Sequence, residues 1–182
     1  MDLIDVPLQP LTAAAFSPYG WILDAGQKPD YARPGLENWR LPFVGRDILR
    51  LQVMRYSNRN MRLSMFERHI NVTEARHPIG NAAAVLVVAG DLTLDGPPSA
   101  DSIKAFLLDG QKGIMFRQGV WHGLDCFPAR TEHVDYLFLS DAATEDEIES
   151  QGSPGNGVHT HIFDFAEQGL AFRVIDPEGV LA

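Results

Sequence analysis

The sequence predicts a mainly β protein, folded as a β-sandwich or barrel with a few short peripheral helices. Hydrophobic runs of strand length recur along the chain and are separated by Gly, Pro, Asn and Asp, whereas apolar residues at helical spacing are scarce. A chain of 182 residues is long enough to bury one substantial core. We therefore expect a single domain over residues 1–182.

Seven segments have the apolar character of strands. They are short and evenly spaced, as in a sandwich or a barrel. In chain order they are Leu49–Tyr56, Leu63–His69, Ala84–Val88, Lys104–Leu108, Gly113–Phe116, Val134–Leu139 and Ala171–Val174.

Two short helices are predicted at the periphery. Thr12 can cap a first helix that ends at Ser17, because Pro18 disfavours helical backbone in the residue before it. A capping-box pattern, in which Thr144 precedes Glu147 by three positions, predicts the start of a second helix.

Two irregular stretches interrupt these elements. Residues 28–45 are rich in Pro, Gly, Asn and aromatic residues, and long stretches without regular structure are often binding elements. Residues 151–157 predict a flexible turn before a final β segment.

The composition argues against several classes of partner. A net charge of −9 would repel phosphate backbones and anionic lipids, so we expect no nucleic acid and no membrane partner. The longest apolar stretch, Ala82–Ala89, is far short of the roughly 20 residues that span a bilayer. The first five residues carry acids where a secretory signal would carry Lys or Arg, and Cys126 has no partner for a disulfide. We expect a cytoplasmic protein.

The most informative segment is the one that ends at His122. A short strand runs into a tight turn that presents Trp121 and His122 side by side. The spacing Gly119-x-x-His122 resembles the second motif of the cupin superfamily, which brings a histidine into a β-barrel, although Arg117 stands where that motif usually has proline. A histidine after a turn can also be a surface or capping residue.

Two Arg-His pairs, Arg68-His69 and Arg76-His77, lie close together in this acidic chain. An arginine side chain can hold a carboxylate through two parallel hydrogen bonds, and a histidine can exchange a proton near neutral pH or bind a metal. The same residues could instead form ion pairs with neighbouring glutamates at the end of a sheet. Both interpretations remain open.

Other candidates favour structural roles. His159 and His161 would share one face of a strand, as a metal site requires, but the residues around them also suit an ordinary edge strand. Cys126 has no basic neighbour to lower its pKa, so we expect a buried, inert thiol.

Taken together, four blocks resemble the ureidoglycolate lyase family. They are Pro7–Gly20, Arg76–Gly80, Ser102–Leu107 and Gly110–His122, in the same order and at the same separation as in that family. The resemblance spans Val6 to Asp141 and leaves residues 141–182 as a C-terminal extension. It implies a bicupin-like β-barrel, a homodimer and a carbon–nitrogen lyase that cleaves ureidoglycolate to glyoxylate and urea in allantoin and purine nitrogen catabolism.

That reaction needs a base for the hydroxyl proton and an acid for the departing urea, and a positioned acid or base typically contributes about 10²–10⁴-fold. His77 and His122 are the candidates for these two roles. A small anionic substrate also needs cationic and polar partners. The candidates for substrate binding are Arg76, Arg68, Arg117, Trp121 and Asn81.

A divalent metal ion is an alternative means of stabilising the developing alkoxide, and its ligands would be His77, His122 and His69. Two other functions also remain open. Gly123 stands where the family has a second imidazole, which leaves room for a protein that binds a small carboxylate or sugar acid without catalysis. The third possibility is a metal-dependent cupin isomerase or dioxygenase.

Overall fold

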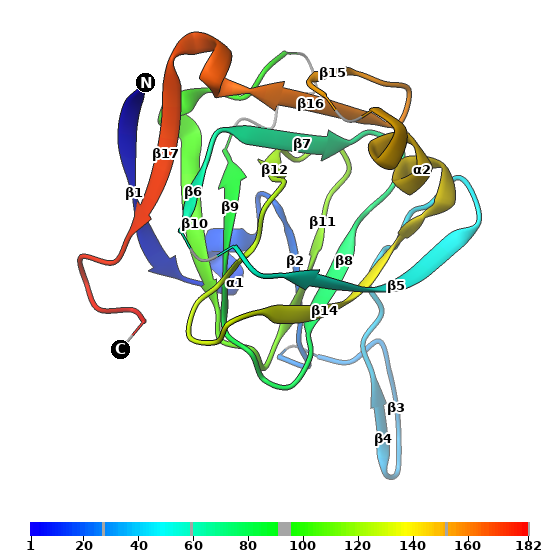
Figure 1. The fold of residues 1–182 in the computed structure, drawn as a ribbon. Helices are drawn as coiled ribbons and strands as arrows, with labels where there is room; N and C mark the ends of the chain where they lie inside the picture. Colours follow the sequence, from blue (N-terminus) through cyan, green and yellow to red (C-terminus); the bar gives the residue numbers. More distant parts are fainter. Residues whose placement is uncertain (27, 59, 91–95, 152, 182) are drawn as a thin grey trace.

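The computed structural model describes residues 1–26, 28–58, 60–90, 96–151 and 153–181. Two curled sheets, of ten and five strands, face each other like the walls of a barrel, and a two-stranded hairpin projects from this body (Figure 1). The mainly β, cupin-like fold with short peripheral helices that the sequence predicts is therefore confirmed.

The ten-stranded sheet contains, in spatial order, β15 (Gly155–Asn156), β16 (Thr160–Asp164), β7 (Met65–His69), β12 (His122–Gly123), β9 (Ala84–Ala89), β10 (Ile103–Leu108), β1 (Asp2–Pro10), β17 (Leu170–Ile175) and β6 (Arg62–Leu63), with β13 (Phe127–Pro128) paired to β9. The five-stranded sheet contains β2 (Gly20–Leu23), β11 (Gly113–Phe116), β8 (Ala75–Pro78), β14 (Val134–Asp141) and β5 (Leu49–Tyr56).

All seven predicted segments form strands, and one of them is divided. The segment Leu63–His69 is split at Ser64, because β6 pairs with β17 whereas β7 pairs with β12 and β16. Strand β1 was not among the predicted segments, since it carries acids and prolines, but it lies between β10 and β17 in parallel pairing. Strand β8 was not predicted either; two of its four residues, Arg76 and His77, are polar.

The two predicted helices are present, with one correction. The side chain of Thr12 accepts a hydrogen bond from the Ala15 amide and caps α1 (Ala13–Phe16), as expected. The second helix, α2 (Ala142–Gln151), begins before Thr144, because the Asp141 carboxylate accepts a hydrogen bond from the Thr144 amide. Among the residues described, no helix has the length and apolar character needed to cross a bilayer.

Residues 28–45 are more regular than expected. They include a hairpin of β3 (Tyr31–Arg33) and β4 (Leu36–Asn38), whose strand residues are all exposed and which extends away from the barrel (Figure 1). The expectation of a stretch without regular structure is wrong, and a role in binding remains a prediction.

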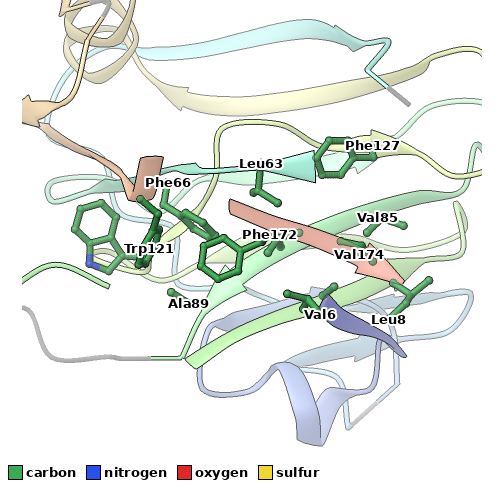
Figure 2. Close-up of a cluster of buried hydrophobic side chains, with 13 residues drawn as sticks. Val6, Leu8, Leu63, Phe66, Val85, Ala89, Trp121, Phe127, Phe172 and Val174 are labelled. Carbon is green, nitrogen blue, oxygen red and sulfur yellow. The ribbon is translucent and has the colours of Figure 1, made fainter. Parts of the chain in front are cut away.

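Strand β9 is buried on both faces and separates two hydrophobic clusters. Because successive side chains of a strand point to opposite faces, Val85, Val87 and Ala89 enter a cluster with β1, β6 and β17 (Figure 2). The alternate residues Ala84, Leu86 and Val88 fill the space between the two sheets. Phe116 and Tyr136 of this second cluster contact residues of the candidate site described below.

The carboxylate of Glu147 ties α2 to the segment that enters β16. It accepts hydrogen bonds from the amides of Val158 and His159, at 2.7 Å each, and from the amide of Thr160, at 2.6 Å. Three backbone donors on one carboxylate hold this connection against the helix.

We expect Glu147→Ala to lower the free energy of unfolding by about 1.5–3 kcal/mol, because hydrogen bonds to a charged group are lost. Urea denaturation measures this change. Glu149→Ala removes an exposed glutamate from the same helix and is expected to change stability by less than about 0.5 kcal/mol. Equal effects of the two substitutions would show that the three hydrogen bonds contribute no stability.

Candidate active site

Five charged or titratable side chains are buried together where the two sheets meet. They are Glu67 and His69 of β7, Glu74 and Arg76 at the start of β8, and His122 of β12, and each is at most 8% exposed. Single ligand atoms of Glu67, His69, Glu74 and His122 all lie within 4.8 Å of one another. We call these five residues the polar cluster.

Strand alternation explains how β7 contributes to the polar cluster. Glu67 and His69 are two positions apart and therefore share one face of the strand. Phe66, on the opposite face, packs in the hydrophobic cluster shown in Figure 2. Glu67 and His69 therefore point away from that hydrophobic cluster.

A turn at Gly119 positions His122 in the polar cluster. Gly119 has a φ of 77°, in the left-handed region that favours glycine, and its amide donates a 2.7 Å hydrogen bond to the His69 carbonyl. The His122 ring then stacks on Phe116, with ring centroids 4.5 Å apart and planes 7° apart. The structure places His122 inside the barrel, and its catalytic role remains a prediction.

Glu74 lies close to three other members of the polar cluster, His69, Arg76 and His122. Its Oε2 lies 2.8 Å from His69 Nε2, and its Oε1 accepts a 2.8 Å hydrogen bond from Arg76 Nε and another from Arg76 Nη2. His122 Nε2 is 3.8 Å from Glu74 Oε2 and has no hydrogen-bond partner in the part of the chain that the structure describes. His122 Nδ1 is 3.8 Å from Glu67 Oε1.

Burial and neighbouring charges give the members of the polar cluster different protonation states. Burial raises the pKa of Glu67 to about 7 and lowers the pKa of His122 to about 3. Burial would also raise the pKa of Glu74, but Arg76 and the two histidines lower it well below its usual value. Burial disfavours the charged form of His69, yet its hydrogen bond to Glu74 raises its pKa. Near neutral pH, Glu74 is ionised, His122 is neutral and Glu67 titrates.

A cavity of about 270 Å³ opens onto the polar cluster. Its size suits a small molecule. It is lined by Glu67, Glu74 and Arg76 of the polar cluster, by Met54, Tyr56, Leu124, Asp125 and Phe138, and by Glu145 and Ile148 of α2.

The polar cluster has the donor set of a divalent metal site. Two imidazoles and two carboxylates converge, which suits a first-row transition metal, and His122 Nε2 is buried without a hydrogen-bond partner among the described residues. Of the three metal ligands considered from the sequence, the structure brings His69 and His122 together and leaves His77 apart. Glu67 and Glu74 complete the candidate set.

The structure places three other sequence candidates outside the polar cluster. His77 follows Arg76 on β8, so the two side chains point to opposite faces, and His77 Nδ1 lies 2.8 Å from the Pro78 carbonyl oxygen. Arg117 is exposed and lies over the Trp21 ring at 4.0 Å. Asn81 is exposed in a turn with a φ of 57°.

Arg68 and Trp121 lie together on the other face of β7. The guanidinium carbon of Arg68 is 4.7 Å from the centre of the Trp121 ring, and Arg68 Nε donates a 3.2 Å hydrogen bond to His161 Nδ1. Figure 2 shows Trp121 at the edge of the hydrophobic cluster beside Phe66. These two residues do not line the cavity of the polar cluster.

Sequence reasoning did not assign a functional role to Glu67 or Glu74. The signal was present in the spacings Glu67-x-His69 and Glu74-x-Arg76, because alternate residues of a strand share a face. The same rule shows that Arg76 and His77 cannot both point into the barrel.

The sequence of this chain is similar to those of known proteins of one family. The sequence profile of the ureidoglycolate lyase family matches residues 3–158, beyond Asp141, where the resemblance seen in the sequence ends. Relatives named ureidoglycolate lyase include a protein of Escherichia coli, 28% identical over 62% of this chain and 74% of its own, and one of Azotobacter vinelandii, 26% identical over 63% and 73%. A relative of the same name from Burkholderia mallei is 29% identical over 63% of this chain and 71% of its own. With most of its length matched by the profile, the chain belongs to the ureidoglycolate lyase family.

Proposed function

We propose that the protein cleaves ureidoglycolate to glyoxylate and urea. The observation that carries this proposal is the polar cluster itself, a set of buried titratable groups that opens into a small cavity in a member of this family. Ureidoglycolate carries a hydroxyl, a carboxylate and a ureido nitrogen on one carbon. Its cleavage moves one proton from the hydroxyl to the departing nitrogen while the carbon–nitrogen bond breaks.

Glu67 is suited to carry that proton. A group with a pKa of about 7 exchanges protons readily in both directions near neutral pH. The Glu67 carboxylate takes the hydroxyl proton as the oxygen forms the carbonyl of glyoxylate, and the electrons of the carbon–nitrogen bond pass to nitrogen. The Glu67 carboxylic acid then returns the proton to that nitrogen, which leaves as urea.

The other members of the polar cluster position the substrate. Arg76 lines the cavity, where its charge attracts the substrate carboxylate. We propose that His69, Glu74 and His122 can hold a divalent ion, which when bound would polarise the substrate oxygens and stabilise a developing alkoxide. Glu74 also fixes Arg76 and His69 through its hydrogen bonds.

The experiment is incubation of the purified protein with ureidoglycolate, with chelator or with added divalent metal, while NMR follows glyoxylate and urea. We expect both products in equal amounts. If no turnover occurs under any metal condition, the proposed function is wrong. If ureidoglycolate raises the melting temperature but is not converted, the protein instead binds a small carboxylate without catalysis.

We also propose that the protein is a cytoplasmic homodimer that takes a small anionic substrate in allantoin and purine catabolism. An exposed apolar surface on β5 and β14 of the five-stranded sheet supports the dimer. Along the edge strand β5, Leu49, Leu51 and Val53 are 52–67% exposed, and Leu137 of the adjacent β14 is 46% exposed. Contiguous exposed apolar side chains on a sheet edge favour association.

Replacing Leu51 and Val53 together by Asp is expected to convert a dimer to a monomer, because two charges would be buried at the interface. Light scattering coupled to gel filtration measures the mass. Leu36→Asp, in the β3–β4 hairpin, is the control and should leave the mass unchanged. A wild-type protein that is monomeric at micromolar concentration would contradict the proposed dimer.

A further inference from the structure

The wall of the cavity beside the polar cluster has many hydrogen-bond acceptors and few donors. Four of the described residues that line it are acids, namely Glu67, Glu74, Asp125 and Glu145. An ionised acid accepts hydrogen bonds but cannot donate them, and the same holds for a substrate carboxylate. The remaining polar side chains in the described part of this wall are those of Arg76 and Tyr56. The donors for a carboxylate in this cavity are therefore found on these two residues.

Arg76 by itself is a weak anchor for a carboxylate. Its Nε and Nη2 atoms both donate hydrogen bonds to Glu74 Oε1, so the charge of Glu74 offsets that of the guanidinium. The guanidinium carbon also lies over two aromatic rings, 5.4 Å from the centre of Phe116 and 5.5 Å from the centre of Phe138. A carboxylate beside Arg76 therefore needs a second donor.

Packing holds Tyr56 at the edge of the same cavity. Tyr56 and Met54 are two positions apart on β5, so they share one face of the strand, and both line the cavity. The Tyr56 ring meets the Tyr136 ring of β14 edge to face, with ring centroids 5.9 Å apart and planes 85° apart. This contact fixes the direction in which the Tyr56 hydroxyl points.

The Tyr56 hydroxyl is free to bind a ligand. It makes no hydrogen bond with the residues that the structure describes. It is close enough to Arg76 and Glu74 for their charges to act on its pKa. Burial raises the pKa of Tyr56 well above its usual value, and this effect outweighs the opposite effect of Arg76. The hydroxyl therefore keeps its proton and is a hydrogen-bond donor near neutral pH.

The two sheets place these donors opposite the proposed proton carrier. Tyr56 and Arg76 belong to β5 and β8 of the five-stranded sheet, whereas Glu67 belongs to β7 of the ten-stranded sheet. A substrate whose carboxylate lies against β5 and β8 can present its hydroxyl to Glu67 across the cavity. It also keeps its negative charge away from the Glu67 carboxylate.

We propose that the Tyr56 hydroxyl donates a hydrogen bond to the substrate carboxylate, and that Tyr56 and Arg76 together form the carboxylate subsite. This inference rests on the proposed function, since it assigns one end of the same substrate. A site built to hydrogen-bond a group discriminates strongly against analogues that lack it. Tyr56 therefore contributes to the selection of acids over their neutral amides.

Ligand binding without turnover tests the subsite. Ureidoacetate keeps the ureido and carboxylate groups but lacks the hydroxyl, so it cannot undergo the elimination, and in ureidoacetamide a neutral amide replaces the carboxylate. Tyr56→Phe removes only the hydroxyl group. By calorimetry, we expect this variant to bind ureidoacetate about 10–100-fold more weakly than the wild-type protein, the usual loss for a hydrogen bond to a charged group. It should lose less affinity for ureidoacetamide, because a neutral acceptor forms a weaker hydrogen bond.

Tyr136→Phe is the matched control. The Tyr136 hydroxyl lies 2.8 Å from Cys126 Sγ and does not line the cavity, so its removal should leave both affinities unchanged. Thermal unfolding verifies that each variant is folded. If Tyr56→Phe binds ureidoacetate as the wild-type protein does, or if it loses affinity for both ligands equally, the assignment is wrong. A wild-type protein that does not prefer ureidoacetate to ureidoacetamide would also overturn it.

Failure of the subsite and failure of the lyase activity give different results. If Tyr56→Phe loses affinity for ureidoacetate while the wild-type protein does not cleave ureidoglycolate, the subsite is supported and the lyase activity is contradicted. If both proteins cleave ureidoglycolate with the same KM, only the assignment of Tyr56 is wrong.

Discussion

Replacing Glu67 by Gln is expected to lower the turnover of ureidoglycolate by about 10²–10⁴-fold, the usual contribution of a positioned acid or base. Glutamine has nearly the shape of the glutamate side chain but cannot take or return a proton. Steady-state kinetics with both proteins measure the loss. Glu132→Gln, which alters an exposed acid, should leave turnover unchanged. Normal turnover in Glu67→Gln would show that another group carries the proton.

The same substitution is expected to change how stability depends on pH. The pKa of Glu67 is about 7 in the folded protein and about 4.5 when the side chain is unperturbed. The folded state therefore binds a proton more tightly, and its stability falls as pH rises from about 4.5 through 7. A shift of this size corresponds to a loss on the order of 3 kcal/mol for a fully buried group.

Urea denaturation of metal-free protein between pH 5 and pH 8 measures this dependence. The neighbouring Glu74, His69 and His122 titrate in both proteins, so the informative quantity is the difference between wild type and Glu67→Gln. We expect the variant to gain stability relative to wild type as pH rises. A constant difference across this range would show that Glu67 ionises with an ordinary pKa.

The fold could be predicted largely because its signal is local. Strand β9 has six consecutive buried residues, and a short apolar run bounded by turn residues, here Asn81 and Gly90, indicates a buried strand without any knowledge of its partners. Strand β1 shows the limit of this reasoning. Its acids and prolines hide its strand character, and only its pairing with β10 and β17 makes it part of the sheet.

The site could be predicted only in part, because tertiary contacts define it. The spacing Gly119-x-x-His122 pointed to His122, which the structure buries in the polar cluster. Glu74 could not be distinguished from a surface ion pair, since its role depends on hydrogen bonds to His69 and Arg76. Glu145 lies on a helix whose sequence resembles any solvated acidic segment. Only the docking of α2 beside the cavity reveals its position.

Replacing His122 by Ala is expected to lower turnover by about 10²-fold or more and to abolish stabilisation by divalent metal, because the ion that would polarise the substrate oxygens loses a ligand. Burial keeps the His122 imidazole neutral, with a pKa of about 3, so the ring needs no deprotonation before it binds a metal. It is a poor proton carrier near neutral pH for the same reason. Its Nε2 has no hydrogen-bond partner among the described residues and lies 3.8 Å from Glu74 Oε2, which favours the role of a ligand.

Thermal unfolding separates the metal site from the packing of the imidazole. His122→Ala also removes the stacking on Phe116, so its melting temperature falls even without metal. The informative quantity is therefore the rise in melting temperature on adding Mn²⁺, Co²⁺, Ni²⁺ or Zn²⁺. A metal at 100 times its Kd stabilises the native state by about 2.7 kcal/mol. We expect this rise in the wild-type protein and in the control His133→Ala, which alters an exposed histidine, and its loss in His122→Ala. A full metal response in His122→Ala would show that His122 is not a ligand. Loss of turnover in His77→Ala but not in His122→Ala would place the chemistry on the outer face of β8 instead of in the barrel.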